Sequence, residues 1–590
     1  MKNILQDIKK YSNKFWQNWL RYLLLFVGLD LFNEMIVIPI FRWSATYTLQ
    51  AGSIPFISYQ NVVTILTKHS LIAVALLLEL LLLILIIYLQ FEVLLLAIQN
   101  IETKFTTILK MTWRVIKKTR ISSLILLLAY FLLIIPFVDM VYRTPLLAKI
   151  QIPQFILDFM TRKWFLFIGL MIFYALVLIL GIRLLLTLPL MAFKKYSGWK
   201  AMKKSWQLTA NKKWFSLVIR LFLIAVVSTI SLTLFYGILL ACQYGGDKIG
   251  GPFAQILVNL NLYLVQAGSV LILAWSTIVS ILVSLHPLNL KSDYQDINYK
   301  KSTLYIIGII IFTLASGETL INNSFYLNRE NLTRPLIISH RGVSDKNGVQ
   351  NTIAALNKTA KLHPNYVEID LHETKDNQFI VMHDENLKKL AGIDKTPKEL
   401  TLKQLKKITL KEDGHQAKIA SFDDYLKAAQ KINQKLLIEI KTTQTDSNSM
   451  LSRFDKKYGK LIKQRNYQVQ SLDYRVIEKS HQIDPKLFVL YIEPYNLTYP
   501  HNLADGYSME YSTLNNDFIW QAHLQDKPVY AWTVDDANTM RKMMYEGADG
   551  IITNDVGKLK KSIQSFEDDK SYASRLLNYI IVLPNPYSIE

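Results

Sequence analysis

Long apolar runs fill the first half of the chain, whereas the second half alternates short apolar runs with amphipathic stretches. A helix needs about 20 mostly apolar residues to cross the hydrocarbon core of a bilayer. Seven runs meet or approach this length: residues 20–41, 71–98, 121–141, 164–193, 214–242, 253–285 and 304–321. The pattern therefore predicts a multi-span α-helical membrane domain over residues 1–325.

Polar residues interrupt the first apolar run on a single helical face. Asp30, Asn33 and Glu34 are spaced i, i+3 and i+4, which places them side by side on a helix. Acidic groups inside a membrane are costly, so two interpretations stay open: a polar contact within the helix bundle, or a site for a lipid headgroup or an ion. The residues before this run mix polar, basic and aromatic types, which predicts an N-terminal interfacial helix rather than a cleavable signal peptide.

The positive charge of the chain is concentrated in the membrane half. Residues 1–320 hold 30 Lys and Arg against 12 Asp and Glu, and the remaining residues hold 37 against 34. The partners expected from this distribution are membrane lipids and not nucleic acid, because the C-terminal half has almost no basic excess. Loops rich in Lys and Arg precede the first run and follow the second, fourth and sixth, and such loops face the cytoplasm. A seventh crossing then places the C-terminal domain outside the cell, in a multi-pass protein of the cell membrane.

Short β-type runs separated by helical stretches follow residue 321, an alternation typical of a parallel sheet or barrel. The expected strands cover residues 336–339, 366–371, 379–382, 436–441, 468–471, 487–492, 528–534 and 550–552, with a further candidate near 506–509. About eight strands over this length favour an α/β TIM (β/α)8 barrel at residues 334–565, followed by a C-terminal tail at 566–590.

Acidic residues stand at the C-terminal ends of two expected strands, where barrels of this type carry their catalytic groups. Glu368 and Asp370 share one face of their strand because side chains alternate with a period of two, and Glu439 lies near the end of another. Carboxylates that converge in a barrel mouth repel one another unless a cation lies between them. Three oxygen ligands without cysteine suit a hard divalent ion, Ca²⁺ or Mg²⁺.

Two histidines and two basic residues also lie at or just after the ends of the expected strands. His340 and His383 suit proton transfer near neutral pH, and Arg341 and Lys441 add fixed positive charge. With a hard metal, these groups can neutralise a phosphate and pass protons to and from its ester oxygens. Each motif alone is common in turns or at exposed strand edges, but their occurrence at successive strand ends indicates phosphodiester cleavage.

The order of these motifs resembles one enzyme family. His-Arg-Gly at 340–342, Val-Glu-Ile-Asp at 367–370, Met-His-Asp at 382–384, Ile-Glu-Ile-Lys at 438–441, Ala-Trp-Thr-Val at 531–534 and Gly-Ala-Asp-Gly at 547–550 look like the glycerophosphodiester phosphodiesterase signature. The multi-span half is similar to the membrane domain found in a bacterial subgroup of that family. The resemblance implies that the three carboxylates bind the metal and the two histidines exchange protons. It also implies that Arg341 and Lys441 contact phosphate, while Trp532 forms a wall against the substrate.

The reaction implied by the resemblance is metal-dependent hydrolysis of glycerophosphodiesters to sn-glycerol 3-phosphate and an alcohol, through a cyclic phosphate. The topology expected from the spans places this reaction at the outer face of the membrane. A deacylated phospholipid, a lysolipid or a glycerophosphate polymer such as teichoic acid would all fit. Two alternatives stay open: a membrane sensor or transporter whose barrel binds phosphodiesters without cleaving them, and a phospholipase-type lyase that stops at the cyclic phosphate. The chain departs from the family pattern at Gln350, where Glu is common, and at Asp535, where Asn is frequent. Residues 385–422 match the family's insertion, which shapes substrate access.

Overall fold

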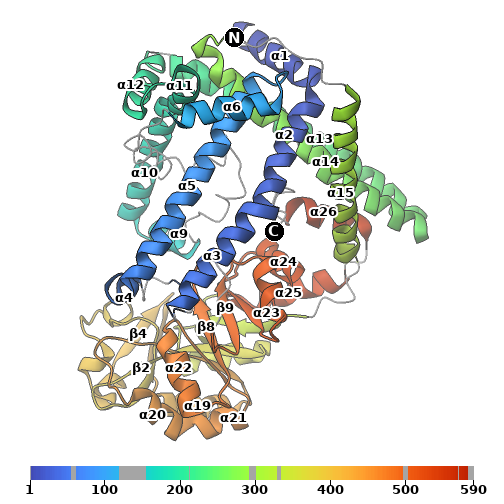
Figure 1. Ribbon diagram of the computed structural model, residues 1–590. Helices are drawn as coiled ribbons and strands as arrows, with labels where there is room; N and C mark the ends of the chain where they lie inside the picture. Colours follow the sequence, from blue (N-terminus) through green and yellow to red (C-terminus); the bar gives the residue numbers. More distant parts are fainter. Residues whose placement is uncertain are drawn as a thin grey trace.

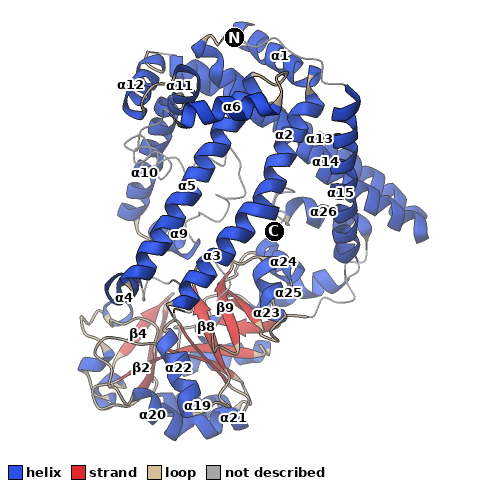
Figure 2. Cartoon of the chain, viewed as in Figure 1, coloured by secondary structure: helices blue, strands red, loops and turns tan. Residues whose placement is uncertain are grey.

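The computed structural model describes residues 2–52, 54, 57, 62–117, 154–211, 213–290, 301–327, 334–495, 502–568 and 571–582. A bundle of long helices forms the N-terminal half, and a barrel of strands ringed by helices forms the C-terminal half (Figures 1 and 2). The helices of the first half are α1 (Lys2–Gln17), α2 (Trp19–Phe32), α3 (Ile38–Ala51), α4 (Val62–Lys68), α5 (Ser70–Gln99), α6 (Phe105–Ile116), α9 (Gln154–Thr161), α10 (Trp164–Leu184), α11 (Thr187–Lys194), α12 (Gly198–Leu208), α13 (Lys213–Ile249), α14 (Gly251–Leu285) and α15 (Lys301–Leu327).

Five helical stretches among the described residues are long and apolar enough to cross a membrane. They are Trp19–Ala51, Ser70–Gln99, Trp164–Lys194, Lys213–Ile249 and Gly251–Leu288. Five of the seven spans expected from the sequence are therefore confirmed as long apolar helices. The span expected at 304–321 lies within the helix α15 but is not among these five, and the span expected at 121–141 lies outside the described residues.

Local sequence explains two features of the bundle. α2 runs into α3 through a single π-helical turn at Asn33–Val37, where the buried Asn33 side chain accepts a hydrogen bond from Gln90 of α5. That contact agrees with the interpretation of Asn33 as part of a polar contact inside the bundle. The chain reverses between α13 and α14 at Gly250 and Gly251, whose φ angles of 74° and 61° are strained for residues with a side chain.

The two ends of the bundle differ in character. α1, α6, α11 and α12 gather at the end far from the barrel, whereas α3, α4 and α9 reach the barrel (Figure 1). The far end therefore holds α1 and the basic helices α6 and α12. α1 packs there against the last part of α14, where Ser12 Oγ lies 2.9 Å from the indole nitrogen of Trp275, which donates the hydrogen bond.

Eight parallel strands close the barrel. They are β1 (Leu336–Ser339), β2 (Tyr366–Glu373), β6 (Leu436–Ile440), β7 (Gln468–Ser471), β8 (Val489–Glu493), β9 (Gly506–Glu510), β10 (Val529–Trp532) and β11 (Gly550–Thr553). Each pairs with the next in chain order, and β1 pairs with both β2 and β11, which closes the ring. The TIM-barrel prediction is confirmed. One detail was wrong, because the expected strand at 379–382 is β3 (Phe379–Val381), which lies antiparallel to the end of β2 and outside the ring. The candidate near 506–509 takes its place as β9.

Side-chain alternation along the strands builds two separate cores. A small cluster of Ile338, Tyr366, Leu437, Leu490, Tyr530 and Ile552 fills the barrel interior. Tyr366 shares its strand face with Glu368 and Asp370, so the polar groups stand above this apolar floor at the C-terminal mouth. The opposite faces pack against the surrounding helices α16 (Ile353–Thr359), α19 (Phe422–Lys431), α20 (Met450–Phe454), α21 (Lys460–Gln464), α22 (Tyr474–Ile483), α23 (Asn516–His523), α24 (Ala537–Glu546) and α25 (Val556–Asp568).

Two segments outside the barrel ring have defined positions. The insertion after β3 contains α17 (Lys388–Ala391), α18 (Leu402–Leu405) and the antiparallel pair β4 (Thr409–Glu412) and β5 (His415–Lys418), around its own small apolar core. The segment expected as a tail contains α26 (Tyr572–Ile581), which packs on α13 and α14. There the backbone N–H of Ala573 donates to Asp247 Oδ2 at 2.7 Å.

Candidate active site

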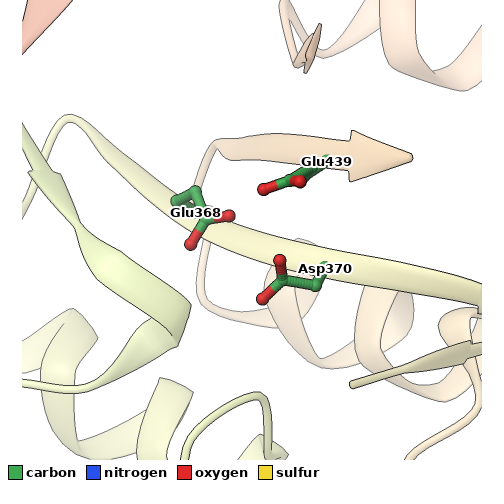
Figure 3. Close-up of side chains that lie close together, drawn as sticks. All are labelled: Glu368, Asp370 and Glu439. Atoms are coloured by element: carbon green, nitrogen blue, oxygen red, sulfur yellow. The ribbon is translucent and has the colours of Figure 1, made fainter. Parts of the chain in front are cut away.

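Three buried carboxylates meet at the mouth of the barrel. Glu368 and Asp370 point inward from β2, and Glu439 points inward from β6, where it lies directly opposite Asp370 in the strand register. One carboxylate oxygen from each lies within 4.8 Å of the others, and the three side chains face one another (Figure 3). The structure therefore brings together all three residues predicted as metal ligands.

The charges of this cluster are only partly balanced. Burial, followed by the negative charges of Asp370 and Glu439, holds the pKa of Glu368 well above its usual range. Burial likewise raises the pKa of Glu439 to about 7, although Lys441 opposes the shift. Burial acts on Asp370 too, but the charges of Lys441, His383 and Arg341 outweigh it and hold its pKa well below the usual range. Without a further cation, two of the three carboxylates thus ionise less readily than a carboxylate in water.

Two cations flank the carboxylates. Lys441 Nζ lies 2.5 Å from Glu439 Oε1 and 3.1 Å from Asp370 Oδ1. Arg341 has a left-handed φ of 52° in the turn after β1, and its backbone N–H donates to Glu368 Oε2 at 2.7 Å. Its guanidinium Nε lies 3.8 Å from Asp370 Oδ2. Both cations predicted from the sequence therefore border the same site.

Gln350 links Arg341 to the insertion. Its amide oxygen accepts from Arg341 Nη1 at 2.8 Å, and its amide nitrogen donates to Glu412 Oε1 at 2.5 Å. An amide can accept from a cation and donate to an anion at once, which a carboxylate at this position cannot do. This geometry explains why the chain carries Gln350 where the family commonly has Glu. It also shows that Glu412 of the insertion holds Gln350 in place, a contact that the sequence around Glu412 did not indicate.

Asn351 supports the carboxylate cluster from the same loop. Its side chain donates to Asp370 Oδ2 at 2.8 Å, and its amide oxygen accepts the Asp370 backbone N–H at 3.1 Å. The residue is buried and has a left-handed φ of 60°, a conformation that asparagine tolerates better than most residues. The first hydrogen bond fixes Oδ2 of Asp370, the second ties Asn351 to the Asp370 backbone, and Oδ1 of Asp370 is left facing Lys441.

His340 is held by a chain of hydrogen bonds from β11. Ser339 and Thr553 lie opposite each other in the register of β1 and β11, so the residues that follow, His340 and Asn554, are neighbours. Nδ1 of His340 lies 2.8 Å from Asn554 Oδ1, while Asn554 Nδ2 and its backbone N–H both donate to Asp535 at 2.7 Å. The Asp535 carboxylate can only accept hydrogen bonds, so the NH2 group of Asn554 must point toward Asp535 and its amide oxygen toward His340. Neutral His340 is therefore protonated on Nδ1 and has its lone pair on Nε2.

His383 has a different partner. Its Nδ1 lies 2.9 Å from Asp384 Oδ1, and its backbone oxygen lies 3.1 Å from His372 Nε2. Burial lowers the pKa of His383 to about 4 and that of His340, which also feels the charge of Arg341, to about 3. A carboxylate partner stabilises an imidazolium, whereas an amide oxygen does so weakly. The two histidines thus differ in how readily they hold a second proton.

Trp532 ends β10 at the same mouth. Its indole nitrogen donates to the backbone oxygen of Ser508 at 2.9 Å, and it lies opposite Glu510 in the register. Glu510 is only 1% exposed, and its Oε1 has no hydrogen-bond partner among the described residues. Burial raises the pKa of Glu510 to about 7. The alternation of side chains along β9 could have predicted that Glu510 points into the barrel. The sequence, however, indicated β9 only as a candidate strand.

Replacing Asp535 with alanine should lower kcat about 10- to 100-fold, a range typical when the support of an active-site histidine is lost. Asn554 would then be free to rotate its amide, and His340 would lose its fixed tautomer. Asp535→Asn retains one acceptor and should keep more activity than the alanine variant. Steady-state kinetics on both variants check this, and a wild-type kcat in Asp535→Ala would contradict the role of the network.

The donor set of the cluster fits a hard divalent cation. All three ligand candidates offer oxygen and none is cysteine or histidine, and burial, followed by the neighbouring carboxylates, raises the pKa of Glu368. Ca²⁺ and Mg²⁺ both favour carboxylate oxygens. Glu368, Asp370 and Glu439 are therefore the side chains that would hold such an ion.

A closed barrel with buried carboxylates, histidines and cations at the C-terminal ends of its strands is an enzyme site suited to phosphate esters. Residues 8–321 match the membrane domain of glycerophosphoryl diester phosphodiesterase, and residues 340–558 match the glycerophosphoryl diester phosphodiesterase family. The first match alone covers more than half of the chain. The chain belongs to the glycerophosphoryl diester phosphodiesterase family, in the form that carries an N-terminal membrane domain. Enzymes of this class hydrolyse glycerophosphodiesters to glycerol 3-phosphate.

Individual relatives are each similar to about two fifths of the chain. A glycerophosphodiester phosphodiesterase of Caldanaerobacter subterraneus is 26% identical over 235 residues, which are 38% of this chain and 95% of that protein. A solved glycerophosphodiester phosphodiesterase from Parabacteroides distasonis is 23% identical, with a TM-score of 0.35 over 40% of this chain and 99% of its own. An Oleispira antarctica phosphodiesterase, solved with the product sn-glycerol-3-phosphate, is 18% identical, with a TM-score of 0.35 over 39% of this chain and 97% of its own.

Proposed function

We propose that this enzyme hydrolyses membrane-linked or wall-linked glycerophosphodiesters at the outer face of the membrane, releasing an alcohol and sn-glycerol 3-phosphate, or 1-acyl-glycerol 3-phosphate where the substrate is a lysolipid. The observation that carries the proposal is the convergence of three carboxylates, two histidines and two cations at one barrel mouth, on a chain whose other half is a membrane domain. The membrane domain keeps that mouth beside lipid, which favours a substrate attached to the membrane or to the cell wall.

The proposed roles follow from the partners of each residue. Arg341 and Lys441 neutralise the phosphate, Glu368, Asp370 and Glu439 hold a divalent cation, Ca²⁺ or Mg²⁺, and Trp532 lines the substrate. The bound ion would polarise a phosphoryl oxygen as a Lewis acid. His340, whose Nε2 carries a lone pair, acts as the base, and His383 acts as the acid in its protonated form, which the Asp384 carboxylate stabilises against the effect of burial.

The proposed reaction has two balanced steps. The glycerol 2-hydroxyl attacks phosphorus as His340 Nε2 takes its proton, and the ester bond to the alcohol breaks as His383 supplies a proton to the leaving oxygen. The product of this step is a cyclic phosphate. Water then attacks phosphorus, giving a proton to His383, while His340 returns a proton to the glycerol oxygen that leaves. Both histidines end in their starting states.

The orientation in the membrane is also proposed. The basic helices lie at the end of the bundle far from the barrel (Figure 1), and Lys and Arg favour the cytoplasmic side. This arrangement supports an extracellular catalytic domain. Protease added to intact cells should then cleave the barrel, and full protection in intact cells with cleavage only after permeabilisation would contradict the proposed orientation.

Substrate choice is tested with the purified protein on glycerophosphocholine, a lysophospholipid and lipoteichoic acid. Cleavage of the lysophospholipid or of lipoteichoic acid is expected, whereas activity on glycerophosphocholine alone would exclude the membrane-linked and wall-linked substrates. Phosphorus NMR of the products separates complete hydrolysis from a lyase that accumulates the cyclic phosphate. Tight binding without turnover on all three substrates would instead support the sensor or transporter.

A further inference from the structure

The membrane half contributes directly to the surroundings of the active site through α9. The ring of Phe155 lies 6.0 Å from the ring of Trp532, centroid to centroid, at an angle of 49°. The backbone N–H of Gln154 donates to Ser512 Oγ at 3.2 Å, and Ser512 in turn donates to Glu510 at 2.5 Å. α9 is thus fixed to the ends of β9 and β10, the same strand ends that border the catalytic mouth.

A second contact ties the membrane half to this side of the barrel. Arg42 of α3 forms an ion pair of 2.9 Å with Asp517 in the first turn of α23, which follows β9. α3 and α9 both reach the barrel in Figure 1. Since both contacts involve residues at or after the C-terminal ends of strands, the catalytic face of the barrel is turned toward the membrane domain.

α9 has two unlike edges. Gln154, Asp158 and Thr161 share a helical face, and this polar edge includes the hydrogen bond to the barrel. The other edge exposes Phe155, Ile156 and Phe159, whose exposed fractions are 41%, 37% and 55%. This apolar edge begins at Trp532 and continues toward α10.

A membrane span follows α9 after a short basic turn. α9 ends at Thr161, and the apolar helix Trp164–Lys194 begins three residues later. Its first residues, Trp164 and Phe165, are 75% and 55% exposed, as expected of side chains that face lipid. Exposed apolar side chains therefore lie on both sides of a short turn that contains Arg162 and Lys163, where Lys163 Nζ lies 5.1 Å from the centre of the Phe159 ring.

We infer that the apolar edge of α9, beginning at Phe155, binds the acyl chain of the substrate, so that the preferred substrates are glycerophosphodiesters that carry an acyl chain. The inference rests on the proposed function and names a substrate class for the same site. A chain lying along α9 would remain in contact with lipid while its phosphate reaches the carboxylates and histidines. Phe155 is then a specificity-determining residue supplied by the membrane half.

Two substrates with the same headgroup test this inference. Lysophosphatidylcholine and glycerophosphocholine differ by one acyl chain, and hydrolysis breaks the same bond in both, between phosphorus and the choline oxygen. Water supplies the added atoms, and the products are choline with 1-acyl-glycerol 3-phosphate or with glycerol 3-phosphate. The full-length protein is reconstituted in phosphatidylcholine vesicles, and kcat/KM is measured for each substrate.

Phe155→Ala should reduce the ratio of kcat/KM for lysophosphatidylcholine to that for glycerophosphocholine about 10-fold, mainly through KM, because an apolar contact of this size contributes roughly one order of magnitude in discrimination. Phe155→Leu should restore most of the ratio, since it replaces the lost apolar surface. Phe173→Ala is the matched control, because Phe173 is 47% exposed on α10 and its ring packs against Tyr174, whereas the ring of Phe155 packs against Trp532. Its ratio should equal that of the wild type.

The outcomes separate the inference from the function on which it rests. An equal fall for both substrates in Phe155→Ala would overturn the inference, because Phe155 would then act only by supporting Trp532. An unchanged ratio would overturn it as well. Absence of turnover on every phosphodiester by the wild-type protein would instead count against the proposed function.

Discussion

Glu439→Ala should reduce turnover by at least about 1,000-fold, because a catalytic divalent ion contributes several kcal/mol to the stabilisation of the transition state. Glu439 provides one of three buried oxygens that lie within 4.8 Å of one another, and no neighbouring acid among the described residues completes this group in its place. Chelation of divalent ions should reduce wild-type turnover to a similar level, and addition of Ca²⁺ or Mg²⁺ should restore it.

Thermal unfolding gives a second measure that does not depend on activity. A ligand that binds only the folded state stabilises it, by about 2.7 kcal/mol at 100 times its dissociation constant. The wild-type melting temperature should therefore rise with the activating ion, and that of Glu439→Ala should rise little. Glu478→Ala, at an exposed position of α22, serves as the control and should behave as the wild type in both measurements. A wild-type response to the ion in Glu439→Ala would contradict the assignment of this ligand.

His340→Ala should lower kcat by about 100- to 10,000-fold, the usual contribution of a general acid or base. Its side chain is hydrogen-bonded to Asn554 and not to the carboxylates, so the rise in melting temperature with the divalent ion should persist. That combination distinguishes the loss of a proton-transfer group from the loss of a metal ligand. Turnover within 10-fold of the wild type would show that His340 transfers no proton in the rate-limiting step.

His383→Ala provides the comparison that separates the acid from the base. A substrate whose alcohol is a good leaving group, such as a nitrophenyl ester of glycerol phosphate, needs no proton on the departing oxygen. Such a substrate should recover much of the lost rate in His383→Ala but not in His340→Ala, because His383 is paired with the Asp384 carboxylate and His340 with an amide oxygen. Recovery in the reverse order would exchange the two roles.

Most of the candidate site could be predicted because the alternation of side chains along a strand determines which residues point into the barrel. Glu368 and Asp370 are two residues apart on an extended strand, so they share a face whatever surrounds them. A parallel barrel then directs the ends of all strands to one mouth, which is why His340, Glu439 and Lys441 could be expected there although they are distant in sequence. The long apolar helices were equally predictable, since membrane spans depend only on length and composition.

Tertiary structure alone decided the neighbours of these groups. Phe379–Val381 has the composition of a barrel strand, and only its antiparallel pairing with β2 places it outside the ring. Asn554 and Asp535 acquire their link to His340 from the register of β1 with β11, and nothing in their local sequence indicates it. The contact of Phe155 with Trp532 joins two domains whose relative position no hydrophobic pattern encodes.

The amino-acid sequence by itself thus determined which residues can perform the chemistry, because residue type and strand parity are local properties. The closing of the barrel and the docking of α9 decided what holds those residues and what lies beside them. Such contacts depend on packing between segments far apart in the chain, as with Gln154 and Ser512, which are separated by 358 positions. The alternation of side chains along each strand therefore locates the candidate catalytic groups, and packing selects their support and the surface along which a substrate can approach them.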